Sequence, residues 1–400
     1  MPDLASVVGP EHVTEDSGIT TVSPASTDET ASIMRLCSEH KLVVTPRGGG
    51  TKLGWGNPVT PQVIVDTTRL SGVREHSWQD LTATVGAGTT WVAMNDALAT
   101  HGQRVALDPA FASHATVGGI IANNDGGSLR MRYGSLRDLV IGMTIVLADG
   151  TIARSGGRVV KNVAGYDLPK LLTGSFGTLG IITEVTFRLH PVQAHSETWA
   201  VRSDAAQPLA ALQQQLLGAA MSIESLQMRT EDDGFALDVR FASLPEVLRE
   251  HEERLRKLCG PLALSTSAND VWQARETLFD KPDATILKVT ALPSKMSPIL
   301  QGFQSLNSTG NNAICVADAV GIITVALATP PAQSATIIDD LRARLRGDGG
   351  MVVILRAGSN LPGDVDRWGG SPPAIEVMRA VKREFDPDRL LNPGKFVGGI

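Results

Sequence analysis

The chain has 400 residues, of which 42% are hydrophobic and 20% are charged, a balance typical of soluble globular proteins. That length is enough for two or three domains, each with a core of its own. The formal net charge of −6 at pH 7 argues against nucleic acid or an anionic membrane surface as a partner.

The N-terminal residues and the longest apolar run bear on where the protein works. MPDLASVVGPEH lacks a basic segment followed by an apolar core, so we expect no secretory signal. The apolar run Ile314–Ala328 is interrupted by Asp318 and Gly321 and is too short to cross a bilayer. We therefore expect a cytoplasmic protein that does not span a membrane and that reaches one only through partners.

The cysteines predict neither a metal site nor a disulfide framework. Cys37, Cys259 and Cys315 are scattered, and the sequence contains no C-x-x-C motif. The chain by itself therefore cannot supply a Cys-ligated iron–sulfur cluster or a zinc knuckle. We expect buried, reduced thiols and no bound metal.

Residues 1–190 alternate short apolar runs with glycine-rich turns. In chain order we expect a helix over 31–40 behind a capping box at Ser26–Glu29, strands at 42–46, 63–67 and 82–88, a helix from Thr89 or Thr90 to Leu98, a hairpin at Asp149-Gly150, a short helix capped by Asp167, and a strand at 181–191.

Residues 191–365 have a different texture. Strand-like and helix-like segments follow one another as strand-helix-strand-strand-helix, roughly twice, without a close sequence repeat. The expected helices are 208–220, 245–259, 297–306 and 334–346, and the expected strands lie near 197–202, 222–229, 235–242, 285–292, 313–319, 321–328 and 351–357. This order predicts an α+β domain with helices on one face of an antiparallel sheet. A turn-rich linker at 361–374 and a helix at 374–385 precede DPDRLLNPGKF at the end of the chain.

Glycine-rich loops carry the chemical signal. RGGGT at Arg47–Thr51 follows an apolar strand, but the chain has no G-K-[ST] P-loop, and Leu53 breaks a G-x-G-x-x-G fingerprint. A second loop holds Gly118-Gly119 and Gly126-Gly127 around Asn123-Asn124, and a third spaces Gly174, Gly177 and Gly180 by three. Backbone amides in such loops bind phosphate. Several of them in one domain predict a backbone that wraps a long phosphate-containing ligand.

The long motifs resemble a known family. PRGGGT, then DP…ATVGGIIANN…YGSLRD, KNVAGYDLPKLLTGSFGTLGIITEV and LNPGK are similar, in this order, to the FAD-linked oxidases of the vanillyl-alcohol oxidase or p-cresol methylhydroxylase type. GGRVVKNVAGYDL is similar to the FAD-binding E subunit of bacterial glycolate oxidases. The resemblance covers about residues 20–190 and the C-terminal end. The middle part has the length and order of the family's cap domain but no matching motif.

The resemblance implies an architecture and a set of cofactor contacts. It implies a p-cresol methylhydroxylase-type FAD-binding domain of two α/β subdomains at 1–190, a ferredoxin-like α+β cap at 191–365, and a segment at 366–400 that returns to the FAD domain. The residues implied to hold FAD are Pro46, Arg47, Gly48, Gly49, Gly50, Thr51 and Lys52 in the first loop, Asp108, Pro109, Thr116, Val117, Gly118, Gly119, Ala122, Asn123 and Asn124 in the second, Gly177, Thr178, Gly180, Ile181 and Ile182 in the third, and Asn392 and Lys395 at the C-terminus.

The first loop also bears on how FAD is attached. Some members of the family link FAD covalently to a histidine there, and Gly48–Thr51 contains none, so we expect non-covalent FAD. The candidates for a residue that touches the flavin or the substrate are His114, Tyr166 and Arg356. Two further candidates, Arg130 and Arg132, lie next to the second loop in the sequence. We expect His195 and His251 to lie outside any catalytic site, and Asp138 and Glu184 to be structural.

One motif of the resembling enzymes is missing. Catalytic D subunits and D-lactate dehydrogenases carry a histidine-rich GHxGDGNxH motif late in the cap, which serves a metal site. The comparable RGDGGMVVILRAG at Arg346–Gly358 keeps Gly-Asp-Gly without a histidine, and no histidine follows His251. Oxidation of a 2-hydroxy acid needs a base for the hydroxyl proton, a cation for the carboxylate and transfer of a hydride to flavin N5.

Three functions stay open. The first is an FAD-binding subunit of a glycolate oxidase-type complex, which converts glycolate or D-lactate to the 2-oxo acid together with a second FAD subunit and an iron–sulfur subunit. The second is a self-sufficient FAD-dependent dehydrogenase for a 2-hydroxy acid or another alcohol. The third is a flavoprotein scaffold that stabilises a catalytic partner without reacting itself. We favour the first, because a chain without C-x-x-C fits an electron path that is completed by another subunit.

Overall fold

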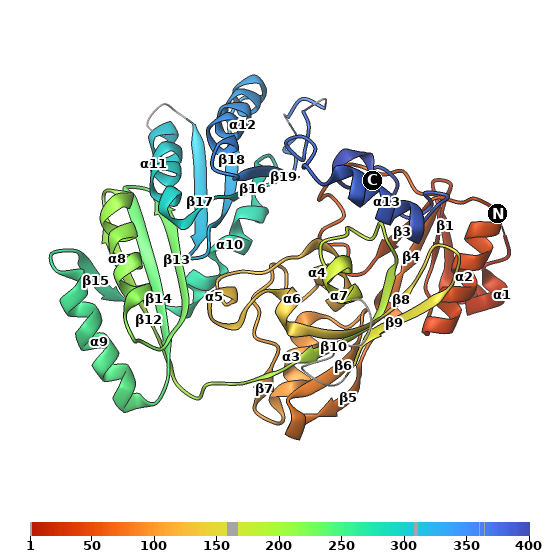
Figure 1. Ribbon diagram of the computed structural model, residues 1–400, viewed down its shortest axis with the longest axis horizontal. Coiled ribbons are helices and arrows are strands. Elements are labelled where there is room, and N and C mark those ends of the chain that lie inside the picture. Colours follow the sequence, from red (N-terminus) through yellow and green to blue (C-terminus); the bar gives the residue numbers. More distant parts are fainter. Residues whose placement is uncertain (1, 158–166, 308–310, 360, 364) are drawn as a thin grey trace. The chain divides into compact units, whose positions relative to one another are not determined.

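The computed structural model describes residues 2–157, 167–307, 311–359, 361–363 and 365–400 (Figure 1). The chain divides into two compact units. The first comprises Met1–Gly126, Gly134–Val192 and Gly370–Ile400, and the second comprises Gly127–Tyr133 and Gln193–Gly369. The domain limits that the sequence predicts, after residues 190 and 365, remain predictions. The sequence did not indicate that Gly127–Tyr133 packs with the second unit.

A mixed sheet opens the first unit, with the strand order β1-β2-β4-β3. Its strands are β1 (Val13–Asp16), β2 (Ile19–Val22), β3 (Val44–Arg47) and β4 (Val63–Asp66). Strands β2 and β3 both run parallel to β4, so the chain needs a crossover between them, and α2 (Thr27–Glu39) supplies it. The Ser26 side chain accepts the N–H of Glu29, so this helix begins at the predicted cap.

The second sheet of the same unit is antiparallel, in the order β5-β6-β10-β8-β9. Its strands are β5 (Val73–Ser77), β6 (Thr82–Gly86), β8 (Val140–Val146), β9 (Ile152–Gly156) and β10 (Ile181–Arg188). The predicted Asp149-Gly150 turn joins β8 to β9, with Gly150 at a φ of +82° and Asp149 accepting the N–H of Thr151. Each sheet has its own apolar core, which agrees with the predicted pair of α/β subdomains.

Shorter elements complete the first unit. They are α1 (Ala5–Val8), α3 (Trp91–Ala99), α4 (Val117–Asn123), α6 (Leu136–Leu139), α7 (Leu168–Leu172), α13 (Ile375–Phe385), β7 (Gln103–Arg104) and β11 (His190–Pro191). Asp167 accepts the N–H of Lys170 and so caps α7, as predicted. Val44 forms an isolated parallel bridge with Leu391, which brings the C-terminal segment beside β3.

The described residues of the second unit form one antiparallel eight-stranded sheet, in the order β15-β12-β14-β13-β17-β18-β16-β19. The strands are β12 (Ser196–Ser203), β13 (Ile223–Glu231), β14 (Gly234–Ala242), β15 (Ala263–Thr266), β16 (Thr285–Thr290), β17 (Asn312–Asp318), β18 (Ile322–Ala328) and β19 (Met351–Arg356). The helices are α5 (Arg130–Tyr133), α8 (Ala206–Gly218), α9 (Pro245–Cys259), α10 (Ala274–Thr277), α11 (Met296–Asn307) and α12 (Pro331–Arg346).

This unit is built twice from the same plan. The halves β12-α8-β13-β14-α9-β15 and β16-α11-β17-β18-α12-β19 meet where β13 pairs with β17. Apolar side chains of α8, α9, α11 and α12, such as Leu212, Leu255, Phe303 and Leu341, share one core with the sheet. The predicted ferredoxin-like cap with helices over an antiparallel sheet is thereby confirmed (Figure 1).

Candidate cofactor site

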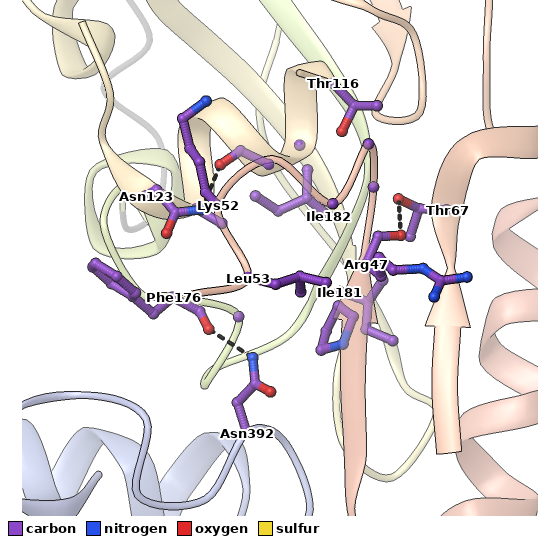
Figure 2. Close-up of a pocket in the computed structure, with 18 of the residues that line it drawn as sticks. Arg47, Lys52, Leu53, Thr67, Thr116, Asn123, Phe176, Ile181, Ile182 and Asn392 are labelled. Carbon is purple, nitrogen blue, oxygen red and sulfur yellow. Dashed lines mark hydrogen bonds between the residues drawn. The ribbon is translucent and has the colours of Figure 1, made fainter. Parts of the chain in front are cut away.

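A pocket in the first unit collects the glycine-rich loops (Figure 2). Its walls come from the loop after β3, from Thr116 with both ends of α4, from the turn before β10 with the start of that strand, and from the C-terminal segment. The predicted cofactor residues that line it are Pro46, Arg47, Gly48, Gly49, Gly50, Thr51, Lys52, Thr116, Gly118, Gly119, Ala122, Asn123, Gly177, Gly180, Ile181, Ile182, Asn392 and Lys395.

The remaining predicted cofactor residues do not line this pocket. Val117 is buried in the apolar core of the second sheet, and Asn124 ends α4 in the left-handed conformation, with a φ of +48°. Pro109 and Thr178 are buried, and Asp108 is half-buried. Conversely, Leu53, Thr67 and Phe176 line the pocket without having been predicted. Phe176 stands inside the third glycine-rich motif and could have been found there, whereas no quoted motif contains Leu53 or Thr67.

The first loop is packed against the second loop. A Cβ atom on Gly48 would lie 2.0 Å from Thr116 Oγ1, and one on Gly49 would lie 1.8 Å from the backbone oxygen of His114. Gly50 has a φ of +73°, which a residue with a side chain adopts only under strain. RGGGT therefore needs its glycines for a close approach of backbone to backbone and for a turn.

The two basic side chains of the first loop are held by carboxylates. Arg47 donates to Asp66 at 2.8 and 3.1 Å. The Lys52 ammonium is buried, 3.3 Å from Asp125 Oδ2, and donates to the carbonyl of Ala110 at 3.0 Å. Because these carboxylates offset both charges, the donors best suited to an anion in this loop are its backbone amides.

Thr116 contributes a polar atom that the protein itself does not use. Its Oγ1 is buried, lines the pocket and finds no hydrogen-bond partner among the described residues. A buried hydroxyl without a partner is costly, so its place in a pocket wall fits a ligand that completes it. Gly118 and Gly119 beside it also line the pocket.

The third loop and the C-terminal segment meet at the opposite wall. Phe176 and Gly177 have φ values of +55° and +68°, and Asn392 has a φ of +43°. Asn392 Nδ2 donates to the carbonyl of Phe176 at 2.8 Å, a bond drawn in Figure 2. Its Oδ1 accepts from Thr45 Oγ1 at 2.7 Å, so one side chain joins three segments. Lys395 Nζ donates to the carbonyl of Leu53 at 2.6 Å.

The two described candidates for catalysis, His114 and Arg356, are not among the residues that line this pocket. His114 is exposed, and its ring nitrogen pairs with Ser113 Oγ at 2.9 Å. Arg356 lies on β19 of the second unit, where it donates to the carbonyls of Phe279 and Lys281, and burial lowers the pKa of its guanidinium. Tyr166 lies outside the described residues. Their roles stay predictions.

The described residues offer neither a metal-ligand cluster nor a membrane-spanning helix. Within the described ranges, no group of three or more His, Cys, Asp and Glu side chains is placed to hold a metal ion. No helix there is long and apolar enough to cross a bilayer.

Comparisons with known proteins place this site in a class. Residues 20–156 match the model described as FAD binding domain, and residues 368–396 match the model described as FAD linked oxidases, C-terminal domain. The structure is similar to that of p-cresol methylhydroxylase, with a TM-score of 0.77 over 98% of this chain and 95% of that one at 16% sequence identity. The fold is thus that of the p-cresol methylhydroxylase-type flavoproteins.

Two curated sequences extend the comparison. The glycolate oxidase subunit GlcD of Bacillus subtilis (strain 168) is 41% identical over 171 residues, which are 42% of this chain and 36% of the relative. This chain therefore spans little more than a third of the length of that curated relative. An uncharacterized FAD-linked oxidoreductase of Mycobacterium tuberculosis (strain CDC 1551 / Oshkosh) is 29% identical over 94% of this chain and 90% of its own. The chain is therefore similar in sequence to FAD-linked oxidases over residues 20–156 and 368–396, and the first of these matches, to an FAD-binding domain, makes FAD its cofactor.

Proposed function

We propose that the pocket of the first unit holds FAD non-covalently and that the chain is an oxidoreductase subunit of a glycolate oxidase-type complex. The observation that carries the proposal is the convergence of the glycine loops and the C-terminal segment on one pocket. The substrate class is a small 2-hydroxy acid, glycolate or D-lactate, and the product is the 2-oxo acid. The similarity to a glycolate oxidase subunit supports this class.

The residues that hold the cofactor follow from the walls of the pocket. Backbone amides of Gly48–Thr51 are the donors for the pyrophosphate, and Thr116 Oγ1 adds a hydroxyl. Ile181 and Ile182 offer apolar surface to a ring. Bound FAD supplies an acceptor for the two electrons of the oxidation. No histidine stands among residues 46–52, so the loop offers the flavin no imidazole to bond to.

The chain's dependence on partners is part of the proposal. No histidine follows His251, so the later part of the cap offers no imidazole base to take the substrate's hydroxyl proton. Within the described residues no cluster of metal ligands takes its place. We therefore place the missing base and the onward electron path in a second FAD subunit and an iron–sulfur subunit. The same observation favours a second candidate, a flavoprotein scaffold whose own flavin never meets the substrate.

The test is an anaerobic titration of the purified chain. We expect a visible flavin band that stays oxidised when glycolate or D-lactate is added to the chain alone and bleaches in the complete complex. Acid denaturation is expected to release the flavin into the supernatant. A band that never forms, even with added FAD, would contradict the site itself. Bleaching of the isolated chain would instead establish a self-sufficient dehydrogenase, and a flavin of this chain that stays oxidised in the active complex would establish the scaffold.

A further inference from the structure

A buried ion pair stands behind the pocket, in the C-terminal segment. All residues of helix α13 are described, and among them only Lys382 is buried. Its Nζ donates to Asp386 Oδ2 at 2.5 Å, to the carbonyl of Thr178 at 2.7 Å and to the carbonyl of Leu391 at 2.9 Å. An ammonium has three N–H groups, and each of them has an acceptor here.

The carboxylate of the pair also accepts several hydrogen bonds. Asp386 is fully buried and also accepts the backbone N–H groups of Leu390 at 2.9 Å and Leu391 at 2.8 Å. Burial lowers the pKa of Lys382, and the charge of Asp386 opposes that shift. Replacing a buried ion pair with well-packed apolar side chains is often neutral or stabilising, so stability alone does not account for this pair.

The segments that this pair joins are those of the pocket walls. Thr178 follows Phe176 and Gly177, which line the pocket in left-handed conformations. Leu391 precedes Asn392, which also lines the pocket and donates to the carbonyl of Phe176. Backbone in such conformations persists only where the surroundings hold it in place. Of the two carbonyls that Lys382 holds, one directly follows the Phe176–Gly177 turn and the other directly precedes Asn392.

A further link reaches the first loop. Val44 donates to the carbonyl of Leu390 at 2.8 Å, and Asn392 donates to the carbonyl of Val44 at 3.0 Å. Val44 begins β3, which ends at Arg47, where RGGGT begins. The pair is therefore positioned to set the spacing between the first and third loops, although neither of its residues lines the pocket.

We propose that Lys382 and Asp386 are positioning residues of the cofactor site: their ion pair holds the Phe176–Thr178 turn and Leu391–Asn392 in the geometry that binds FAD. The proposal concerns the FAD site alone and does not depend on which substrate the chain oxidises.

The experiment compares Lys382→Met with Lys41→Met. Lys41 forms an exposed ion pair, at 2.5 Å, with Asp388 of the C-terminal segment. Its variant therefore removes an ion pair of this segment without affecting the Phe176–Thr178 turn. The readouts are the dissociation constant for FAD, measured from quenching of flavin fluorescence on titrating apoprotein, and the visible circular dichroism of bound flavin. We expect Lys382→Met to raise the dissociation constant at least tenfold and to change the visible spectrum, and Lys41→Met to change neither.

A second variant covers the case in which Lys382→Met fails to fold because Asp386 is left charged and unpaired. Lys382→Met/Asp386→Asn removes both charges and keeps both side-chain sizes. We expect this variant to fold and still to bind FAD at least tenfold more weakly, with an altered visible spectrum. A double variant with the wild-type dissociation constant and spectrum would show that the pair serves only stability and would overturn the proposal. Wild-type chain that takes up no FAD would instead refute the cofactor site itself.

Discussion

At the scale of single residues, the glycines of RGGGT are needed for packing within the protein as well as for ligand binding. A side chain at Gly48 or Gly49 would collide with Thr116 or with the backbone of His114, before any cofactor is considered. The first and second loops pack closely because backbone of both forms the wall of the same pocket. A glycine cluster thus marks a place where backbones meet, and the ligand occupies what they leave open.

This close packing predicts a stability defect for Gly49→Ala. The new Cβ would lie 1.8 Å from the backbone oxygen of His114, so the loops have to separate. Overpacking of this kind lowers the free energy of unfolding by about 1–3 kcal/mol, measured by urea denaturation of the apoprotein. Gly54→Ala is the control, since its Cβ meets nothing within 4 Å, and it should stay within about 0.5 kcal/mol of wild type. Equal stability of the two variants would refute the account of the loop.

Thr116 allows cofactor binding to be separated from folding. Its Oγ1 is buried and has no partner among the described residues, so Thr116→Val should not lower the free energy of unfolding of the apoprotein and should raise it slightly. Loss of a hydrogen bond to a charged phosphate weakens binding by about 1.5–3 kcal/mol, so the dissociation constant for FAD should rise roughly tenfold to a hundredfold.

The control for Thr116 is another buried threonine of the same unit. Thr183 Oγ1 donates to the carbonyl of Thr144 at 3.2 Å and does not line the pocket. Thr183→Val should therefore destabilise the apoprotein by about 1 kcal/mol and leave the affinity for FAD unchanged. The reverse pattern in the two variants would rule out a cofactor contact at Thr116.

At the scale of elements, the two halves of the cap sheet depend on tight hairpins. Gly321 turns the chain between β17 and β18 with a φ of +97°, and a Cβ there would lie 2.1 Å from the backbone oxygen of Ala291. Helix α11 contains Gly302, whose Cβ would meet nothing within 4 Å. The same substitution at these two glycines should therefore change stability in opposite directions.

We expect Gly321→Ala to lower the free energy of unfolding of the cap by about 1–3 kcal/mol, because both the turn and the space resist a side chain. Gly302→Ala should raise it by about 0.5–1 kcal/mol, because a helix interior favours alanine. Both variants should bind FAD with wild-type affinity, since they lie in the other unit. Urea denaturation and a flavin titration test this, and destabilisation by Gly302→Ala would contradict the assignment of α11.

For the whole molecule, the thiols report on the integrity of two apolar cores, that of the first sheet and that of the cap. Cys37, Cys259 and Cys315 are free and buried, in the first and second units. Burial raises the pKa of Cys37 to about 12 and of Cys259 to about 11, and it raises that of Cys315 as well.

Raised pKa values keep these groups as thiols near neutral pH, so little reactive thiolate is present. We expect a thiol reagent at pH 7–8 to label none of the cysteines in the native protein and all of them after unfolding in guanidinium. The fraction labelled is counted by mass spectrometry of the intact chain. Rapid native labelling of any of them would show that its core opens more readily than its burial indicates.

Local chemistry was readable from the chain itself. Ser26, Asp149-Gly150 and Asp167 each act within a few residues, and the structure confirms the cap, the turn and the helix start that they predict. The repeated strand and helix order of the cap was readable for the same reason, since apolar periodicity is a local property. Of the predicted loop residues, most line the pocket because glycine-rich motifs mark the backbone that forms its walls.

The tertiary structure alone decided the features that depend on distant parts of the chain. Val117 and Asn124 belong to a predicted loop, yet α4 turns the first into the core and ends at the second. Phe176 reaches the pocket because Asn392 holds its carbonyl across more than two hundred residues of sequence. Asp386 stands in DPDRLLNPGKF, but the sequence does not indicate that Lys382 reaches the carbonyl of Thr178, because only folding brings these two segments together. The sequence by itself indicated an FAD-linked oxidase and most of the loop residues that line the pocket, and the fold decided how those loops are held.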